Sequence, residues 1–134
     1  MPASVFFDTN VLIYAISDAE PKAARAEALL ASGGVVSVQV LNEFTSVARR
    51  KLQMQWPEIT QALNDFLVLC PEPMPILLST HEVALKIAQK YGFGVFDALV
   101  VASAIQAKCE TLYSEDLQDG QVLENALTVR NPFK

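Results

Sequence analysis

Four carboxylates stand far apart in the sequence, each beside a strand-like or helix-like segment where a charged side chain is unexpected. They are Asp8, Glu43, Asp97 and Asp116. A carboxylate in apolar surroundings is costly unless it pairs with a cation or binds a metal ion. Carboxylate oxygens are the ligands that Mg²⁺ and Mn²⁺ prefer. Four such groups on separate segments therefore predict a shared site for a divalent cation.

Asp8 and Asp97 also have a structural explanation, because each lies where a helix is expected to begin. An Asp at this position often caps the helix, and its charge is favourable near the positive end of the helix dipole. Capping by Asp8 is not required, since Thr9 or Asn10 could cap the same helix. Asp97 could combine capping with metal binding only if different lone pairs of its carboxylate served each role. Both interpretations stay open for both residues.

Glu43 and Asp116 differ in how well their surroundings explain a charge. On a helix, Glu43 shares a face with Val40 and Val47, so its carboxylate lies within an apolar stripe. This favours a functional role, although a carboxylate at the edge of the stripe could extend to water. Asp116 lies in a polar turn rich in acids, in which Asp119 or Glu115 could serve equally well.

The segments that would position these acids alternate between strands and helices. The pattern predicts strands at Val5–Phe7, 35–38, 76–78, 111–114 and 127–129. It predicts helices at 10–16, 22–30, 39–51, 57 or 58 to 69, 79–91 and 96–107. Such alternation indicates an α/β fold with a mainly parallel sheet and helices on both faces. Ligands bind such sheets beyond the carboxyl ends of the strands, where we expect Asp8 and Asp116.

The length of 134 residues suits one domain, and the formal net charge is −5. A nucleic-acid-binding protein usually presents a basic face, so this charge weakens a nucleic-acid function unless cations offset the acids. Basic residues do cluster at Arg49, Arg50 and Lys51, which could contact phosphates or form an ordinary solvated helix end. Cys70 and Cys109 fit no metal spacing. With no signal peptide and no bilayer-length apolar stretch evident, we expect a cytoplasmic protein that does not bind membranes.

The remaining composition argues against several other kinds of catalysis. His81 is the only histidine, so a Ser-His-Asp or Cys-His-Asn triad is not expected. The five glycines form neither a P-loop nor a G-x-G-x-x-G motif, and no nucleotide-phosphate loop is predicted. A phosphatase of the haloacid-dehalogenase type would need a second acid two residues after Asp8, where this chain has Asn10.

Four short motifs in this order resemble the PIN-domain nucleases, and more narrowly the VapC-type toxins of bacterial toxin–antitoxin pairs. The motifs are Phe7-Asp8-Thr9-Asn10, Asn42-Glu43-Phe44, Phe96-Asp97-Ala98 and Ser114-Glu115-Asp116. The resemblance extends from residue 5 to about residue 129. It implies that residues 1–134 form a single PIN domain, with a PIN-like three-layer α/β/α sandwich and a mainly parallel sheet of four to five strands.

The same resemblance implies a Mg²⁺- or Mn²⁺-dependent endoribonuclease, a hydrolase of RNA phosphodiesters. Its catalytic and metal-binding acids would be Asp8, Glu43, Asp97 and Asp116, with Asn10 and Ser114 as supporting polar residues. Asp119 is an additional candidate ligand. The implied partners are an RNA substrate, a VapB-like antitoxin and a second copy of the chain in a homodimer.

Two other functions are compatible with the same residues. A PIN nuclease could process RNA without an antitoxin, and only the presence or absence of an adjoining antitoxin gene would separate the two. A non-catalytic interaction module could use the acids solely as caps and turns. In that case Mg²⁺ would not raise the melting temperature, because a ligand stabilises only a protein that binds it.

Overall fold

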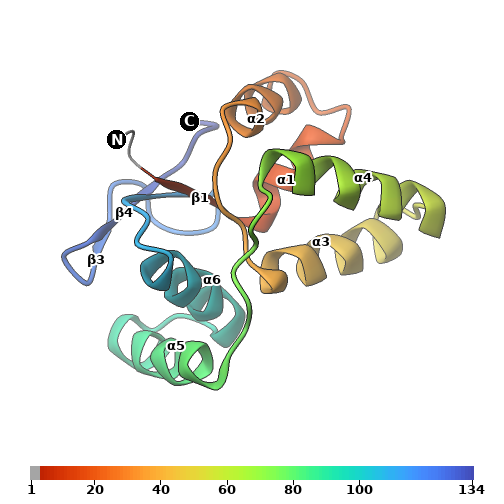
Figure 1. The fold of residues 1–134 in the computed structure, drawn as a ribbon. Helices are drawn as coiled ribbons and strands as arrows, with labels where there is room; N and C mark the ends of the chain where they lie inside the picture. Colours follow the sequence, from red (N-terminus) through yellow and green to blue (C-terminus); the bar gives the residue numbers. More distant parts are fainter. Residues whose placement is uncertain (1–3) are drawn as a thin grey trace.

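The computed structural model describes residues 4–134, which form four strands and six helices (Figure 1). The strands are β1 (Val5–Phe7), β2 (Thr111–Tyr113), β3 (Val122–Leu123) and β4 (Leu127–Arg130). The helices are α1 (Thr9–Ala15), α2 (Lys22–Ala31), α3 (Val38–Arg50), α4 (Trp56–Leu69), α5 (Leu78–Tyr91) and α6 (Val95–Gln106). Figure 1 shows α5 and α6 on one side of the strands and α1 to α4 on the other.

The strands form one sheet in the order β1-β2-β4-β3. β1, β2 and β4 run parallel, and β3 pairs antiparallel with β4. Phe6, Leu112 and Val129 lie in register across the three parallel strands and are fully buried. The predicted α/β fold with a mainly parallel sheet is confirmed. Because β1 and β2 are parallel neighbours, Asp8 and Ser114, which follow them, lie at the same edge of the sheet.

The predicted strand at 35–38 is reduced to a one-residue extension of the sheet. Val35 forms a parallel bridge with β1: its N–H donates to the Val5 carbonyl at 2.9 Å, and its carbonyl accepts from the Phe7 N–H at 3.0 Å. The pairing ends because Ser37 is already the N-cap of α3, and its hydroxyl accepts a hydrogen bond from the Val40 N–H at 3.2 Å.

The prediction of a strand at 76–78 was wrong, because Leu78 begins α5. The residue that pairs in this region is Met74, whose N–H donates to the Val36 carbonyl at 2.8 Å and whose carbonyl accepts from the Val38 N–H at 2.9 Å. A proline stands on either side of Met74. In a parallel ladder these two neighbours point away from the partner segment, so their missing N–H groups do not affect this pairing. The pairing ends because the partner segment enters α3 at Val38.

Gly34 allows the chain that leads into α3 to lie directly against β1. A Cβ atom at this position would come within 2.5 Å of the Phe7 ring and 2.9 Å of a Val5 methyl group. Any larger residue would therefore push the segment away from the sheet. This close approach brings the start of α3, and with it Glu43, beside the carboxyl end of β1.

The six helices agree with the predicted ranges to within two residues at each end. α6 is the most deeply buried of them, because its residues 98–104 are all buried. Several of these are alanines, and small side chains allow a helix to pack against neighbours on most sides. Asp97 precedes this buried segment and lies in the first turn of α6. Within residues 4–134, no helix has the length and apolar character needed to cross a membrane.

Candidate active site

Asp8 lies at the junction between β1 and α1, where it is almost completely buried, with an exposed fraction of 3%. Its Oδ1 atom accepts a hydrogen bond from the Thr9 N–H at 2.7 Å, so Asp8 is the N-cap of α1. Its Oδ2 atom accepts from the Ser114 hydroxyl at 2.7 Å. Its backbone N–H donates to the Tyr113 carbonyl of β2 at 3.0 Å. The capping role is therefore real, and each carboxylate oxygen keeps a further lone pair for a ligand.

Burial is the main reason that the pKa of Asp8 rises from 3.8 to about 7. The hydrogen bonds from Ser114 and Thr9 act in the opposite direction, and the negative charges of Asp116 and Glu43 raise the pKa further. A carboxylate this poorly solvated is unstable in its charged form near neutral pH. A bound cation would remove that instability.

Asp97 is the third residue of α6, and the N-cap of that helix is Gly94. The alternative explanation of Asp97 as a cap is thus wrong. Among residues 4–134 its carboxylate has no hydrogen-bond donor within bonding distance, and it lies half-buried in the cleft. Burial raises its pKa first, and the charges of Asp116 and Glu43 add to the effect. Its carboxylate is therefore available to a cation.

Asp116 lies in the exposed turn that follows β2 and is held there by two side chains. The Asn10 amide donates to its Oδ2 atom at 3.2 Å, and the Ser114 hydroxyl oxygen accepts from its N–H at 3.1 Å. Asn10 also accepts a hydrogen bond from the Glu115 N–H at 3.3 Å. Both predicted supporting residues thus contact the candidate acids directly, and they fix the turn relative to α1 and β1.

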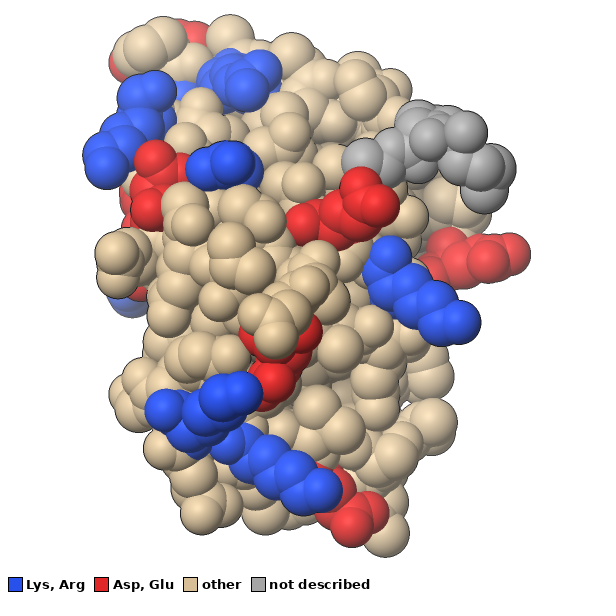
Figure 2. All heavy atoms as spheres, turned by 90° about the vertical axis from the view of Figure 1, so that its left-hand side faces the viewer, with Lys and Arg blue, Asp and Glu red and all other residues tan. Residues whose placement is uncertain are grey.

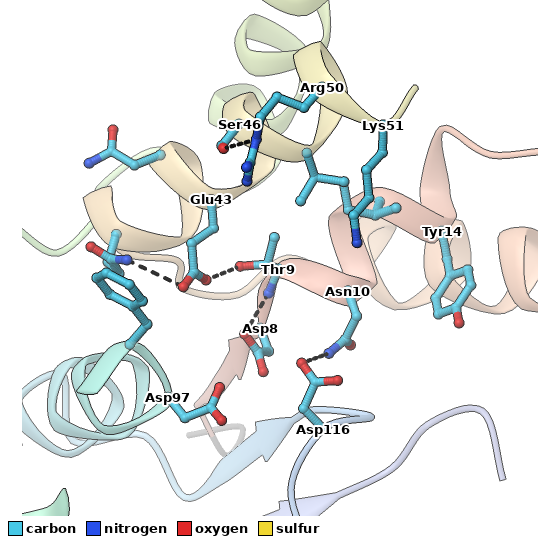
Figure 3. A pocket seen from close by; sticks show the side chains of 15 residues that line it. Asp8, Thr9, Asn10, Tyr14, Glu43, Ser46, Arg50, Lys51, Asp97 and Asp116 are labelled. Atoms are coloured by element: carbon cyan, nitrogen blue, oxygen red, sulfur yellow. Dashed lines mark hydrogen bonds between the residues drawn. The ribbon is translucent and has the colours of Figure 1, made fainter. Parts of the chain in front are cut away.

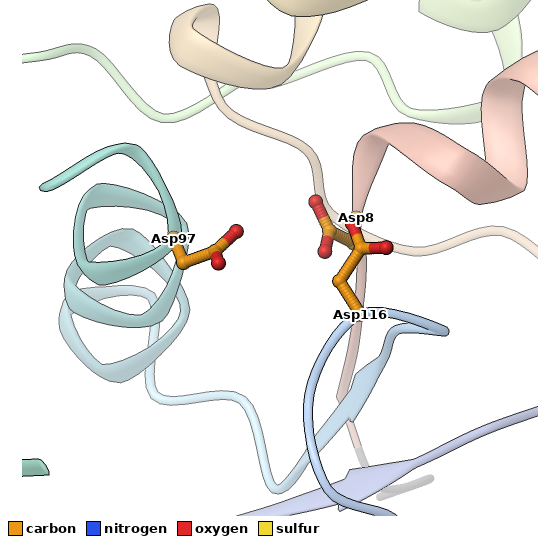
Figure 4. A group of neighbouring side chains, drawn as sticks. All are labelled: Asp8, Asp97 and Asp116. Carbon is orange, nitrogen blue, oxygen red and sulfur yellow. The ribbon is translucent and has the colours of Figure 1, made fainter. Parts of the chain in front are cut away.

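Three of the four predicted acids come together in space. Asp8, Asp97 and Asp116 point toward one another from three separate segments (Figure 4), and each offers a carboxylate oxygen within 4.8 Å of the others. Two oxygens on opposite sides of a bound Mg²⁺ ion lie roughly 4 Å apart. Small side-chain rotations would therefore let one divalent cation contact all three, and an all-oxygen, anionic donor set suits Mg²⁺ or Mn²⁺.

Glu43 lies outside that group of three but lines the same cleft (Figure 3). Its Oε2 atom accepts a hydrogen bond from the Thr9 hydroxyl at 2.6 Å, and its Oε1 atom accepts from the Gln39 amide at 3.3 Å. These bonds hold the carboxylate toward the cleft from the half-buried face of α3. The apolar-stripe interpretation therefore placed Glu43 on the correct side of its helix.

The cleft has a volume of about 770 Å³ and lies between α1, α3, the start of α6 and the turn after β2. Several of its lining residues were missed by the sequence reasoning. Thr9 was considered as a cap and as part of a motif, and neither Gln39 nor Phe96 was considered as a residue of the site. Gln39 had a usable signal, because it stands four residues before Glu43 on the same helix.

Arg50 and Lys51 also line the cleft, and Figure 3 shows both side chains extending from α3 toward the acids. Basic residues elsewhere are scattered. On the face shown in Figure 2, Lys and Arg side chains of the described residues form small separate groups beside Asp and Glu, and no broad basic surface covers that face. Arg50 and Lys51 thus bring positive charge next to the acids of the cleft.

Two other residues that the sequence brought into question lie outside the cleft lining. Asp119, the additional candidate ligand, accepts a hydrogen bond from the Asn131 N–H at 2.9 Å and stabilises the C-terminal turn. His81 is exposed on α5. Neither position supports a role in catalysis.

The chain belongs to the PIN domain family, whose sequence model matches residues 5–118. No curated protein is similar enough to be counted as a relative. The matched segment contains all four candidate acids and both supporting residues.

Solved structures of toxins share this fold. A toxin–antitoxin complex from Klebsiella pneumoniae has 21% identity, a TM-score of 0.73 and coverage of 98% of this chain and 99% of that chain. VapC20 from Mycobacterium tuberculosis, a sarcin–ricin-loop-cleaving toxin, has 18% identity, a TM-score of 0.70 and coverage of 84% and 90%. VapBC2 from Rickettsia felis, bound to a promoter DNA fragment, has 20% identity, a TM-score of 0.65 and coverage of 93% and 97%. At these identities the likeness establishes the shared fold.

Proposed function

We propose that the protein is a Mg²⁺- or Mn²⁺-dependent endoribonuclease that hydrolyses RNA phosphodiesters. The observation that carries this proposal is the convergence of Asp8, Asp97 and Asp116 within 4.8 Å of one another at the end of a parallel sheet. Membership of the PIN family supports it independently. Neither the acidic cleft alone nor the family alone would specify the reaction.

Asp8, Asp97 and Asp116 would hold the cation, and Asn10 and Ser114 would keep two of these carboxylates in place through the hydrogen bonds described above. A divalent ion at this position offsets the negative charges that face a phosphodiester and lowers the pKa of a nearby water molecule. In-line attack of that water on the phosphorus would release a 5′-phosphate and a 3′-hydroxyl.

Glu43 would position the attacking water or serve as a further metal ligand. Its carboxylate is oriented by Thr9 and Gln39, so it lies in the cleft without taking part in the group of three aspartates. Thr9 has a double role here, because its N–H binds Asp8 and its hydroxyl binds Glu43. It links the two parts of the site.

The biological role we propose is that of the toxin in a VapBC-type toxin–antitoxin pair. Supporting this role, solved structures with the same fold include a toxin–antitoxin complex and VapBC2. We further propose a VapB-like antitoxin as partner, and a homodimer as the state of the free chain. Induced expression should arrest growth, and co-expression of a small protein encoded next to this gene should restore it. The toxin role would be contradicted if expression did not arrest growth, or if co-expression of the adjoining gene did not relieve the arrest.

The direct test of the chemistry is cleavage of a single-stranded RNA pool by the purified protein with Mg²⁺, with Mn²⁺ and with EDTA. Cleavage should require the metal and should be lost in Asp8→Asn and Asp97→Asn. Asp18→Asn, which removes an exposed carboxylate outside the cleft, is the matched control and should cleave normally. Undiminished cleavage in EDTA, or by both site variants, would contradict the metal mechanism.

A further inference from the structure

Phe96 exposes an aromatic ring at the edge of the acidic cleft. Its exposed fraction is 61%, although the rest of α6 from residue 98 to residue 104 is buried. Single exposed apolar side chains are common on protein surfaces and need no explanation by themselves. Phe96 differs because it lines the cleft and directly precedes Asp97, one of the three converging aspartates. Its ring is therefore within the reach of any molecule bound at those acids.

The cleft also contains cations with no carboxylate partner of their own. Among residues 4–134, each ion pair uses Lys22, Lys90 or Lys134, and neither Arg50 nor Lys51 has a carboxylate within 4.0 Å. Arg50 Nε donates to the Ser46 hydroxyl at 3.1 Å, which orients the guanidinium and leaves its terminal N–H groups available. Two cations without ion-pair partners, one of them oriented by a hydrogen bond, lie beside a group of acids and suit a ligand that carries phosphates.

We propose that Phe96 stacks on a base of a single-stranded RNA segment whose phosphates bind Arg50 and Lys51 in the same cleft. This inference rests on the proposed ribonuclease function and specifies the form of its substrate. A nucleic acid repeats a planar ring and a phosphate, and the cleft offers an aromatic face, two cations and an acidic centre for a divalent ion. Base pairing and stacking hide the faces of the bases in a duplex, so the ring can be used only by an unpaired strand.

The binding test uses Glu43→Gln, which keeps the three aspartates, as a slowly cleaving background. Its affinity for a 5′-labelled single strand of about ten nucleotides is measured by fluorescence anisotropy in Mg²⁺. Phe96→Leu keeps an apolar side chain but removes the ring, and it should weaken binding about tenfold. Phe96→Tyr keeps the ring and should bind within about twofold of the background. Leu78→Ala, at an exposed apolar position of α5 outside the cleft, should change nothing.

The basic residues are tested by the salt dependence of the same binding. Arg50→Gln and Lys51→Gln should each lower the slope of log K against log[salt] by about 0.7, the value for one phosphate contact on a single strand. Lys86→Gln, on the exposed face of α5, should leave the slope unchanged. A fully paired duplex of the same sequence should bind more weakly and should not respond to Phe96→Leu. Unchanged melting temperatures would show that these surface variants fold normally.

Different failures would separate the two proposals. If wild type does not cleave RNA with Mg²⁺ or Mn²⁺, the proposed function is overturned. If wild type cleaves and Phe96→Leu binds and cleaves single strands equally well, only the stacking proposal is overturned. The same conclusion would follow if Phe96→Leu lost binding of a protein partner while RNA binding was unchanged, because the ring would then belong to a protein interface.

Discussion

Glu115 and Asp116 are consecutive residues of one turn, yet their carboxylates have opposite surroundings. Glu115 accepts hydrogen bonds from the Lys22 ammonium and the Tyr14 hydroxyl, each at 2.7 Å. The Lys22 ammonium also lies 4.7 Å from the centre of the Tyr14 ring. Asp116 instead faces two other aspartates of the cleft. Glu115 is paired with a cation, whereas Asp116 belongs to a group of acids that form no ion pair within residues 4–134.

The pKa of Glu115 moves in the opposite direction to the pKa values of Asp8 and Asp97. Burial is the largest single influence on the pKa of Glu115 and raises it, but the hydrogen bonds from Lys22 and Tyr14 and the charge of Lys22 together outweigh burial and lower the pKa. Burial and neighbouring charges raise the pKa of Asp8 and Asp97. Acids that destabilise one another in the free protein are candidates for binding a ligand, whereas paired acids stabilise the fold. If this distinction holds, variants of the two kinds of acid will differ in catalysis, in stability and in metal binding.

The largest contrast is expected in catalysis. Asp97→Asn removes a carboxylate of the proposed metal site, and RNA cleavage should fall at least about a hundredfold, since even outer-shell partners of metals are worth 10–100-fold. Glu115→Gln removes a charge that is already paired and should keep cleavage within a few-fold of wild type. Initial rates on one RNA with saturating Mn²⁺ check both. Equal losses in the two variants would show that the turn acts as a single catalytic unit and that the distinction is wrong.

The next largest effect is expected in how the free energy of unfolding of the metal-free protein depends on pH. Because the pKa of Asp8 is 3.8 unperturbed and about 7 in the folded protein, the folded state binds more protons between these values. The free energy of unfolding therefore falls as pH rises from about 4 to about 7. Asp8→Asn should remove this loss and make the metal-free protein more stable at pH 8, by on the order of 2–4 kcal/mol.

Urea denaturation of wild type and Asp8→Asn at pH 4 and pH 8 measures the effect. The two proteins should differ little at pH 4, where the wild-type carboxyl is largely protonated in the folded state. Asp18→Asn, at an exposed position, should track wild type at both pH values. A variant that is less stable than wild type at pH 8 would mean that the hydrogen bonds from Ser114 and Thr9 outweigh the burial of the charge.

The effect of metal binding on the melting temperature should distinguish Asp116 from Glu115, and this difference should be smaller than those in catalysis and in pH-dependent stability. Saturating Mg²⁺ or Mn²⁺ should raise the melting temperature of wild type by about 5 °C, as expected for mass-action stabilisation of one to two kcal/mol in a chain of this size. Asp116→Asn should lose most of this rise, and Glu115→Gln should keep it. Thermal unfolding with and without EDTA measures both. A rise that is unaffected by Asp116→Asn would exclude this carboxylate from the metal site.

The convergence of the acids was predictable where it depended on regular elements. The alternation of strands and helices placed Asp8 and the turn after β2 at one sheet edge, and helical periodicity placed Glu43 on the correct face of α3. The role of Asp97 was undecided because it depends on where α6 begins. If the N-cap is Asp97 its carboxylate caps the helix, and if the N-cap lies three residues earlier the carboxylate is free. The structure places the cap at Gly94.

Contacts between distant residues were beyond sequence reasoning. Thr9 and Glu43 are 34 positions apart, and Ser114 and Asp8 are 106 apart, so neither hydrogen bond has a local signal. The wrong strand at 76–78 has a different cause. Its apolar run suggested β structure, but the neighbouring segment enters α3 at Val38 and Leu78 begins α5, so no extended partner faces residues 76–78. The apolar composition of this run shows neither whether a partner strand is available nor that Ile76, Leu77 and Leu78 are exposed.

The smallest effect is expected for the paired acid itself. The lowered pKa of Glu115 means that its ion pair stabilises the fold above the unperturbed value of 4.5, and that this contribution is lost as pH falls through the folded pKa. Glu115→Gln should therefore destabilise the protein at pH 7 by less than about 1 kcal/mol, because the pair is partly exposed. The difference should shrink as the pH falls below 4.5. Urea denaturation in EDTA measures this change in the free energy of unfolding, with Glu72→Gln as an exposed control. The change should be opposite in sign to that of Asp8→Asn. If Glu115→Gln instead stabilises the protein at pH 7, the charge of Glu115 destabilises the fold as the charge of Asp8 does.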